Sequence, residues 1–172
     1  NVSVVQLRSP MFAERVAAAL EQRGTPRGKL VIEFTESAAI DGSTQVERSI
    51  NSLAALGVRL AVDDFGTGYA NLANLSRFPF NKLKIDRSLV PASVEDSRKV
   101  SVLEKVISLA RDLGFSTVVE GVETPDELAV VHSLGCAIVQ GYFFSPPISA
   151  ERTTELLWDD ALFGAGFGQR VK

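Results

Sequence analysis

The sequence is poor in the residues that build disulfide frameworks and zinc sites. Among its 172 residues it contains one cysteine, Cys136, and one histidine. A single cysteine forms no disulfide within the chain, which is typical of proteins from a reducing compartment. One cysteine and one histidine also fall short of the ligand set that a structural zinc ion takes. Any metal bound here is therefore expected to be held mainly by oxygen ligands.

Excess positive charge and long apolar runs are missing as well. The 18 Lys and Arg residues are outnumbered by 21 Asp and Glu residues, which gives a formal net charge of −3. This balance disfavours binding to nucleic acid polymers but leaves a small nucleotide as a ligand. No apolar stretch approaches the ~20 residues that span a bilayer, and the first residues lack the features of a signal peptide. We therefore expect a cytoplasmic protein, and because the first residue is Asn1 rather than Met, we expect processing or a cut upstream.

Short apolar segments bounded by turn residues alternate with helical patterns along the chain. The expected strands are Leu30 to Thr35, Val58 to Asp63, Lys82 to Asp86, Phe115 to Glu120 and Cys136 to Gln140. The expected helices run from Ser9-Pro10 to Gly24, from Thr44 to Leu56, from Ser97 to Leu113, from Thr124 to Gly135 and onward from Ser149. In the third of these helices, Val102, Val106, Leu109, Ala110 and Leu113 repeat at helical spacing.

This alternation predicts repeated βα units and a parallel sheet. An eight-unit (β/α) barrel normally takes about 250 residues, which is more than this chain has. A doubly wound open sheet fits the length more comfortably. Length alone therefore favours the open sheet, and the placement of the polar residues has to decide between the two.

Polar residues gather at the carboxyl ends of the predicted strands: Glu33 in the first, Asp63 and Asp64 at the second, Lys84 and Asp86 on the third, Glu120 followed by Glu123 at the fourth, and Gln140 at the fifth. Acids from several strands converge only if the strand ends share one rim, as at the C-terminal face of a barrel. Clustered carboxylates repel one another unless cations lie between them. Carboxylate and amide oxygens suit Mg²⁺ or Mn²⁺, and two such ions can activate water for phosphodiester hydrolysis. Lys84 would stabilise negative charge in the transition state.

Each of these residues taken alone also has an ordinary structural explanation. Glu33 and the Lys84/Asp86 pair are compatible with simple ion pairs, and Asp63 to Gly66 with a strand-to-turn signal. The acids from Glu120 to Thr124 are compatible with the approach to a helix N-terminus. The repetition at successive strand ends is what favours a functional site.

Six segments, in this order, resemble the EAL domain family of bacterial cyclic di-GMP phosphodiesterases. They are Asn1-Val2-Ser3, Glu33-Phe34-Thr35-Glu36, Asp63-Asp64-Phe65-Gly66-Thr67-Gly68-Tyr69, Leu83-Lys84-Ile85-Asp86-Arg87, Glu120-Gly121-Val122-Glu123-Thr124 and Gln140-Gly141-Tyr142-Phe143-Phe144-Ser145. The resemblance runs from the first residue to about Leu157. The chain begins after the Glu-Ala-Leu segment that names the family, so we expect a fragment of a longer gene product.

The resemblance implies an α/β fold, a TIM-like (β/α) barrel truncated at its N-terminus, with about six of eight units present. Residues 1–158 would form the partial barrel and residues 159–172 a C-terminal tail. The implied reaction is metal-dependent hydrolysis of cyclic di-GMP to linear pGpG, with Mg²⁺ or Mn²⁺ as cofactor. The alternatives are a catalytically inactive cyclic di-GMP receptor and a non-functional fragment.

Roles for individual residues also follow from the resemblance. It implies that Asn1, Glu33 and Asp63 are ligands of one metal, that Asp63 bridges to a second metal, and that Asp64 lies beside it. Glu120 would be a further ligand or the base for the attacking water, and Lys84 would orient that water or stabilise charge. The supporting residues implied are Glu36 for the loop from Asp63 to Tyr69, Asp86 as a partner of Lys84 or its surroundings, and Glu123 and Gln140 for the site or the substrate.

Partners also follow from the resemblance. Family members often pair through the helix after the signature loop, here Asn71 to Arg77, so homodimerisation is one expected arrangement. Fused upstream sensory or GGDEF domains, sometimes with a membrane anchor, are others.

Overall fold

A computed structural model describes residues 1–35, 43–68 and 72–158. Four strands, seven α-helices and two 3₁₀ turns follow one another in these ranges. The strands are β1 (Val31–Thr35), β2 (Arg59–Phe65), β3 (Lys82–Ile85) and β4 (Ser116–Val119). The α-helices are α1 (Val4–Leu7), α2 (Phe12–Arg23), α4 (Thr44–Ala55), α5 (Leu72–Arg77), α6 (Ser97–Asp112), α7 (Pro125–Ser133) and α8 (Ala150–Trp158), and the 3₁₀ turns are η1 (Arg27–Lys29) and η2 (Arg87–Leu89).

All strands of the sheet are parallel, and their spatial order follows the sequence: β1, β2, β3, β4. Segments outside the four strands extend this sequential order beyond both edges of the sheet. The Val2 N–H donates to the Glu33 carbonyl beside β1 at 2.8 Å, and Val139 forms a parallel bridge with Val119 of β4. A doubly wound sheet reverses its strand order at a switch point, whereas a barrel wall keeps adding the next strand on the same side. The sheet therefore has the order of a barrel wall, and the preference that length gave to an open sheet was wrong.

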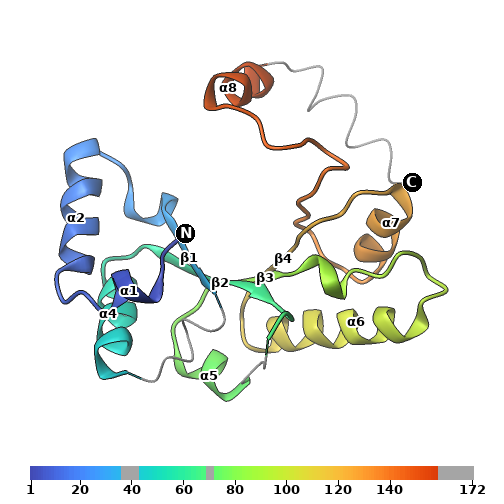
Figure 1. The fold of residues 1–172 in the computed structure, drawn as a ribbon, viewed down its shortest axis with the longest axis horizontal. Coiled ribbons are helices and arrows are strands. Elements are labelled where there is room, and N and C mark those ends of the chain that lie inside the picture. Colours follow the sequence, from blue (N-terminus) through green and yellow to red (C-terminus); the bar gives the residue numbers. More distant parts are fainter. Residues whose placement is uncertain (36–42, 69–71, 159–172) are drawn as a thin grey trace.

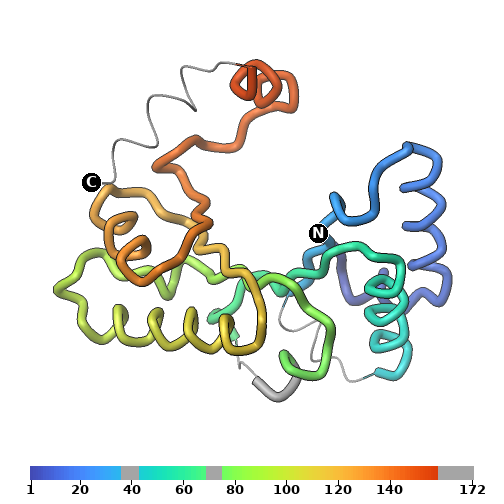
Figure 2. Tube along the Cα trace, turned by 180° about the vertical axis from the view of Figure 1, so that it is seen from behind, coloured from blue at the N-terminus to red at the C-terminus, as the bar shows by residue number. Residues whose placement is uncertain are grey.

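The helices pack around the sheet as βα crossovers require. Figure 1 shows α5 and α6 on one side of the sheet, with α1, α2 and α4 grouped near β1 and α7 near β4. The same grouping is visible from behind in Figure 2, where α8 again lies apart from the sheet. Fully buried apolar side chains fill the contact between helices and sheet, among them Phe34, Ile50, Leu60, Ile85 and Leu103.

Local sequence signals explain where most helices begin and end. Ser43 caps α4 by accepting from the Val46 N–H at 3.3 Å. Thr124 and Glu127 form a capping box at the start of α7. Gly24 ends α2 in the left-handed conformation at φ 60°, which glycine adopts without the steric cost of a side chain.

The structure differs from the sequence expectations in four places. The helix expected at Ser9-Pro10 begins at Phe12, because Ser9 accepts the Phe12 N–H and forms a turn first. The short helix α1, capped by Ser3 and Gln6, was not expected. The strand expected over residues 136–140 contributes a single bridge, between Val139 and Val119, although backbone hydrogen bonds also join Ile138 and Gln140 to Val119. The buried face of α6 is formed by Leu103, Ile107 and Ala110, whereas Val102 is exposed.

No helix in the described ranges is both long and apolar enough to cross a membrane. The division between a barrel at residues 1–158 and a tail stays a prediction, because residues 159–172 lie outside those ranges.

The contact between the chain after β4 and the segment around Gly141 gives a test of this fold. A methyl group at Gly141 would lie 2.0 Å from the Val122 carbonyl oxygen and 2.4 Å from its nitrogen. These backbone atoms cannot move aside cheaply, so Gly141→Ala is expected to lower the free energy of unfolding by about 1–3 kcal/mol. Thermal denaturation checks this, with Gly28→Ala as the control because nothing lies within 4 Å of its added methyl group. Equal melting temperatures for the two variants would contradict the close approach.

Candidate metal centre

The ammonium group of Lys84 lies among three carboxylates. Its Nζ is 2.9 Å from Glu33 Oε2, 2.7 Å from Asp63 Oδ1 and 2.9 Å from Glu120 Oε1. The Lys84 side chain is only 10% exposed, so these ion pairs are largely withdrawn from water. One lysine thus connects acids from separate strands, and each acid was predicted from the sequence to belong to the site.

The order of the strands explains why these groups meet. Lys84 lies on β3, with β2 and its Asp63 on one side and β4, followed by Glu120, on the other. Glu33 lies on β1, one strand beyond β2, on the face of β1 opposite the buried Ile32 and Phe34. Because parallel strands end at the same rim, a lysine on the inner strand β3 reaches all three.

A bulge in β2 brings a further acid to the same place. Val62 pairs with Leu83 and Phe65 with Ile85, so β2 has one residue more than β3 in this interval. Asp64 adopts φ 55°, the left-handed conformation that aspartate tolerates better than most residues. In a regular strand the adjacent Asp63 and Asp64 would point to opposite faces. The bulge instead brings one oxygen each of Asp63, Asp64 and Glu120 within 4.8 Å of one another.

This group of three carboxylates has the chemistry of a site for a hard divalent cation. The Oδ1 of Asp63 is buried and, among the described residues, has no hydrogen-bond partner, although the Lys84 ammonium lies close to it. That contact is an ion pair without the direction of a hydrogen bond. A buried carboxylate oxygen with spare coordination, next to two further carboxylates, fits Mg²⁺ or Mn²⁺. The cluster could therefore hold a metal ion.

The pKa values of the site follow from burial and from its charges. Burial, and then the nearby charges of Asp63 and Asp86, raise the pKa of Asp64 above its ordinary value. Burial also raises the pKa of Glu120, and Lys84 only partly opposes this. For Lys84 burial acts to lower the pKa, but its contacts with Asp63, Glu120 and Glu33 outweigh burial and raise it. Lys84 is thus held as a cation among the acids.

Asn1, Asp86 and Glu36 were also predicted to belong to the site. Asn1 is exposed at the start of the chain, beside Glu33 through the Val2 backbone bond. Asp86 accepts the Ser88 N–H at 2.8 Å and caps η2, and in the described ranges it forms no pair with Lys84. Its hydrogen bonds with Ser88 and Arg87 lower its pKa despite burial. Glu36 lies outside the described residues.

Glu123 and Gln140 lie together on the wall of a cavity of about 800 Å³. Tyr142 and Phe144 also line this cavity, as does Gly121, the residue that directly follows Glu120 in the chain. The structure therefore places the two predicted support residues on the wall of one cavity.

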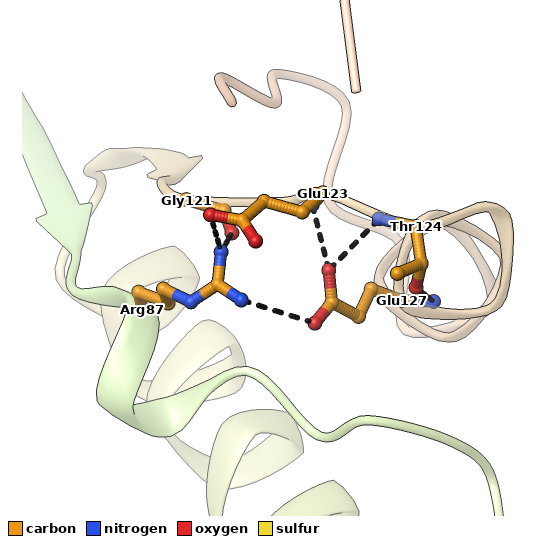
Figure 3. A network of polar contacts seen from close by, with 5 residues as sticks. All are labelled: Arg87, Gly121, Glu123, Thr124 and Glu127. Atoms are coloured by element: carbon orange, nitrogen blue, oxygen red, sulfur yellow. Dashed lines mark hydrogen bonds and ion pairs between the residues drawn. The ribbon is translucent and has the colours of Figure 1, made fainter. Parts of the chain in front are cut away.

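Arg87 and Glu127 have contacts here that local sequence patterns do not indicate. Arg87 contacts both Gly121 and Glu123, and Glu127 is buried beneath them (Figure 3). Arg87 follows Asp86 in the sequence, but nothing in the local pattern indicates that its side chain crosses to the chain after β4. For Glu127, its spacing from Thr124 indicates only a helix cap.

Comparison with known proteins gives consistent matches. The family model described as EAL domain matches residues 1–147. The chain is 36% identical over 151 residues to the oxygen sensor protein DosP of Escherichia coli (strain K12), covering 88% of this chain and 19% of that protein. It is 38% identical over 148 residues to the cyclic di-GMP phosphodiesterase RocR of Pseudomonas aeruginosa, covering 86% of this chain and 38% of RocR.

Solved structures agree with the fold. The PaMucR phosphodiesterase in its c-di-GMP complex matches with a TM-score of 0.81 and 33% identity, over 89% of this chain and 62% of that chain. This likeness confirms the predicted TIM-like barrel with part of its wall absent from the chain. The chain spans 19% of DosP and 38% of RocR, well under two thirds of either relative.

Removing the lysine charge tests the electrostatic account of the cluster. Lys84→Met keeps most of the side-chain volume but leaves Glu33, Asp63 and Glu120 facing one another. Without added metal, we expect a loss of unfolding free energy on the order of 3 kcal/mol, because buried charges lose their partner. Added Mn²⁺ should raise the melting temperature of this variant more than that of the wild type, because the cation replaces the lost charge.

Lys105→Met is the matched control, since the Lys105 side chain is 75% exposed and its ion pair in the described part of the chain is with the neighbouring Glu104. If Lys84→Met and Lys105→Met melt alike, or Mn²⁺ stabilises both equally, the account is wrong.

Proposed function

Because this chain belongs to the EAL domain family, we propose that it takes part in the metal-dependent hydrolysis of cyclic di-GMP to linear pGpG. The observation that carries the proposal is the convergence of Asp63, Asp64 and Glu120 around one position, with Lys84 in contact with two of them. A relative with 38% identity is named a cyclic di-GMP phosphodiesterase, and a structural neighbour is a phosphodiesterase with c-di-GMP bound. These names support the choice of substrate.

The carboxylates of Asp63, Asp64 and Glu120 would hold Mg²⁺ or Mn²⁺, with Glu33 and Asn1 as further oxygen ligands. Glu33 is already drawn toward the cluster by its 2.9 Å contact with Lys84. Asp63, the most buried of the acids, is the best candidate to bridge two ions, because its Oδ1 has coordination to spare. A pair of cations would offset the repulsion that one lysine leaves uncompensated.

When bound, such cations lower the pKa of a coordinated water and polarise the phosphate oxygens. Linear pGpG carries its terminal phosphate on a 5′ oxygen, so water attacks phosphorus and the bond from phosphorus to one 3′ oxygen breaks. The proton lost by the water ends on a carboxylate, for which Glu120 is placed, and the departing 3′ oxygen takes up a proton. Lys84, held as a cation by its acidic neighbours, stabilises charge on the phosphate and orients the water.

The remaining predicted residues have supporting roles in this proposal. Glu123 and Gln140 border the cavity of about 800 Å³, where part of the nucleotide would lie. Asp86 supports the turn after β3 through its Ser88 contact. Glu36 would hold the loop after β2.

The wider assembly also stays a proposal. Homodimerisation through α5 (Leu72–Arg77) and fusion to sensory or GGDEF domains follow from the family, and a place in the cytoplasm or beside a membrane depends on those domains.

The direct test is Mg²⁺-dependent conversion of cyclic di-GMP to pGpG by the intact protein expressed from its gene. Asp63→Asn keeps the side-chain shape but removes the charge of a central ligand. Since losing a mere support of a ligand costs about 10–100-fold, this change should lower kcat by more than that. Chelation with EDTA should abolish turnover, and Mg²⁺ should restore it.

Glu104→Gln serves as the control, because Glu104 lies on α6 with its side chain 54% exposed. Binding of Mg²⁺ and cyclic di-GMP by the wild type without product would contradict hydrolysis and favour a receptor.

A further inference from the structure

Arg87 links the end of β3 to the chain that follows β4. Its guanidinium donates to the Gly121 carbonyl oxygen at 2.6 Å and pairs with the Glu123 carboxylate through the same nitrogen. Its other terminal nitrogen lies 3.8 Å from Glu127 Oε1. Figure 3 shows the side chain reaching from η2 to the segment from Gly121 to Thr124.

The backbone after β4 is shaped to receive this arginine. Gly121 has φ +70°, and an added methyl group would lie 2.6 Å from Arg87 Cβ and 2.9 Å from Cγ. Both the left-handed conformation and the close approach therefore require glycine at this position. Glycine is also the residue whose backbone turns most freely once its contacts are removed.

Glu127 holds the same segment from the opposite side. Its Oε2 accepts the Glu123 N–H at 2.6 Å and the Thr124 N–H at 3.0 Å, and Thr124 Oγ1 accepts the Glu127 N–H at 3.2 Å. The Glu127 side chain is buried and spans the gap between this backbone and Arg87 (Figure 3). The backbone from Gly121 to Thr124 is thus held by both the Arg87 guanidinium and the Glu127 carboxylate.

Glu120 lies between two attachments to the segment that carries Lys84. The Glu120 N–H donates to the Ile85 carbonyl at 2.9 Å. The carbonyl of the following residue, Gly121, accepts from Arg87. Residues 85 and 87 flank the turn immediately after Lys84, whose Nζ contacts the Glu120 carboxylate. The relative position of Lys84 and Glu120 therefore depends on bonds made on both sides of Glu120.

We propose that Arg87 and Glu127 are positioning residues that fix Glu120 toward Lys84 and the carboxylates of Asp63 and Asp64. The proposal rests on the function proposed above, in which Glu120 holds metal or accepts a proton. It assigns Glu123 to the support of Arg87. Without Arg87, the chain turns at Gly121 and the Glu120 carboxylate leaves the cluster for part of the time.

The two terminal nitrogens of the Arg87 guanidinium are both needed to position this backbone. One guanidinium reaches the Gly121 carbonyl and faces Glu127 with different nitrogens, whereas a lysine ammonium makes its contacts from one atom. Arg87→Lys should therefore recover only part of what Arg87→Ala loses.

The test compares Arg87→Ala, Arg87→Lys and Glu127→Ala with the wild type in the intact protein. Arg87→Ala should lower kcat by about 10–100-fold and weaken Mn²⁺ binding by about tenfold, the usual cost of losing a support of a metal ligand. Its KM for cyclic di-GMP should change less than about threefold, because Arg87 is not proposed to contact substrate. The Glu123 and Thr124 amides should exchange hydrogen faster in both alanine variants.

Arg152→Ala is the control, because it removes an arginine whose exposed ion pair is with Glu155 of the same helix, α8. Arg87→Ala with wild-type kcat and Mn²⁺ affinity would overturn the proposal. If Arg87→Ala does not fold, Arg87→Lys decides by the same two readouts. If the wild type does not hydrolyse cyclic di-GMP, the proposed reaction fails, while Mn²⁺ affinity, measured by calorimetry, still decides on positioning.

Discussion

The carboxylates of β1, β2 and the end of β4 share one space because the Lys84 ammonium lies among them. At contacts of 2.7–2.9 Å, opposite charges in a partly buried site attract strongly, and the same acids without a cation would repel. One positive charge nevertheless cannot balance Glu33, Asp63, Asp64 and Glu120 together. The arrangement therefore retains an excess of negative charge that further cations would offset, and this excess is the physical basis for a metal centre.

Two features of the backbone make that concentration of charge possible. Parallel strands in sequential order bring their carboxyl ends to one rim, so that residues far apart in the sequence become neighbours. The bulge in β2, with Asp64 at φ 55°, turns two adjacent aspartates toward the same site. Strain of this kind persists only where the surrounding structure holds it, and it is common at functional sites. Beyond β4, the contacts of Arg87 and Glu127 hold the backbone that follows Glu120 in place.

Much of this could be predicted from the sequence, since it depends on local patterns. Apolar runs located the strands, and residues such as Thr124 and Gly24 located helix ends. Polar residues at strand ends identified Glu33, Asp63, Lys84 and Glu120 as neighbours. The bulge was not predictable, because it depends on the register between β2 and β3. The crossing of Arg87 to Gly121 is also a contact over 34 positions that no local pattern encodes.

Anomalous diffraction from crystals of the intact protein grown with Mn²⁺ tests the central claim most directly. The account predicts a manganese peak in contact with the carboxylate of Asp63 and with Asp64 or Glu120. A peak bound elsewhere, with Lys84 still the sole cation among these acids at saturating Mn²⁺, would contradict it.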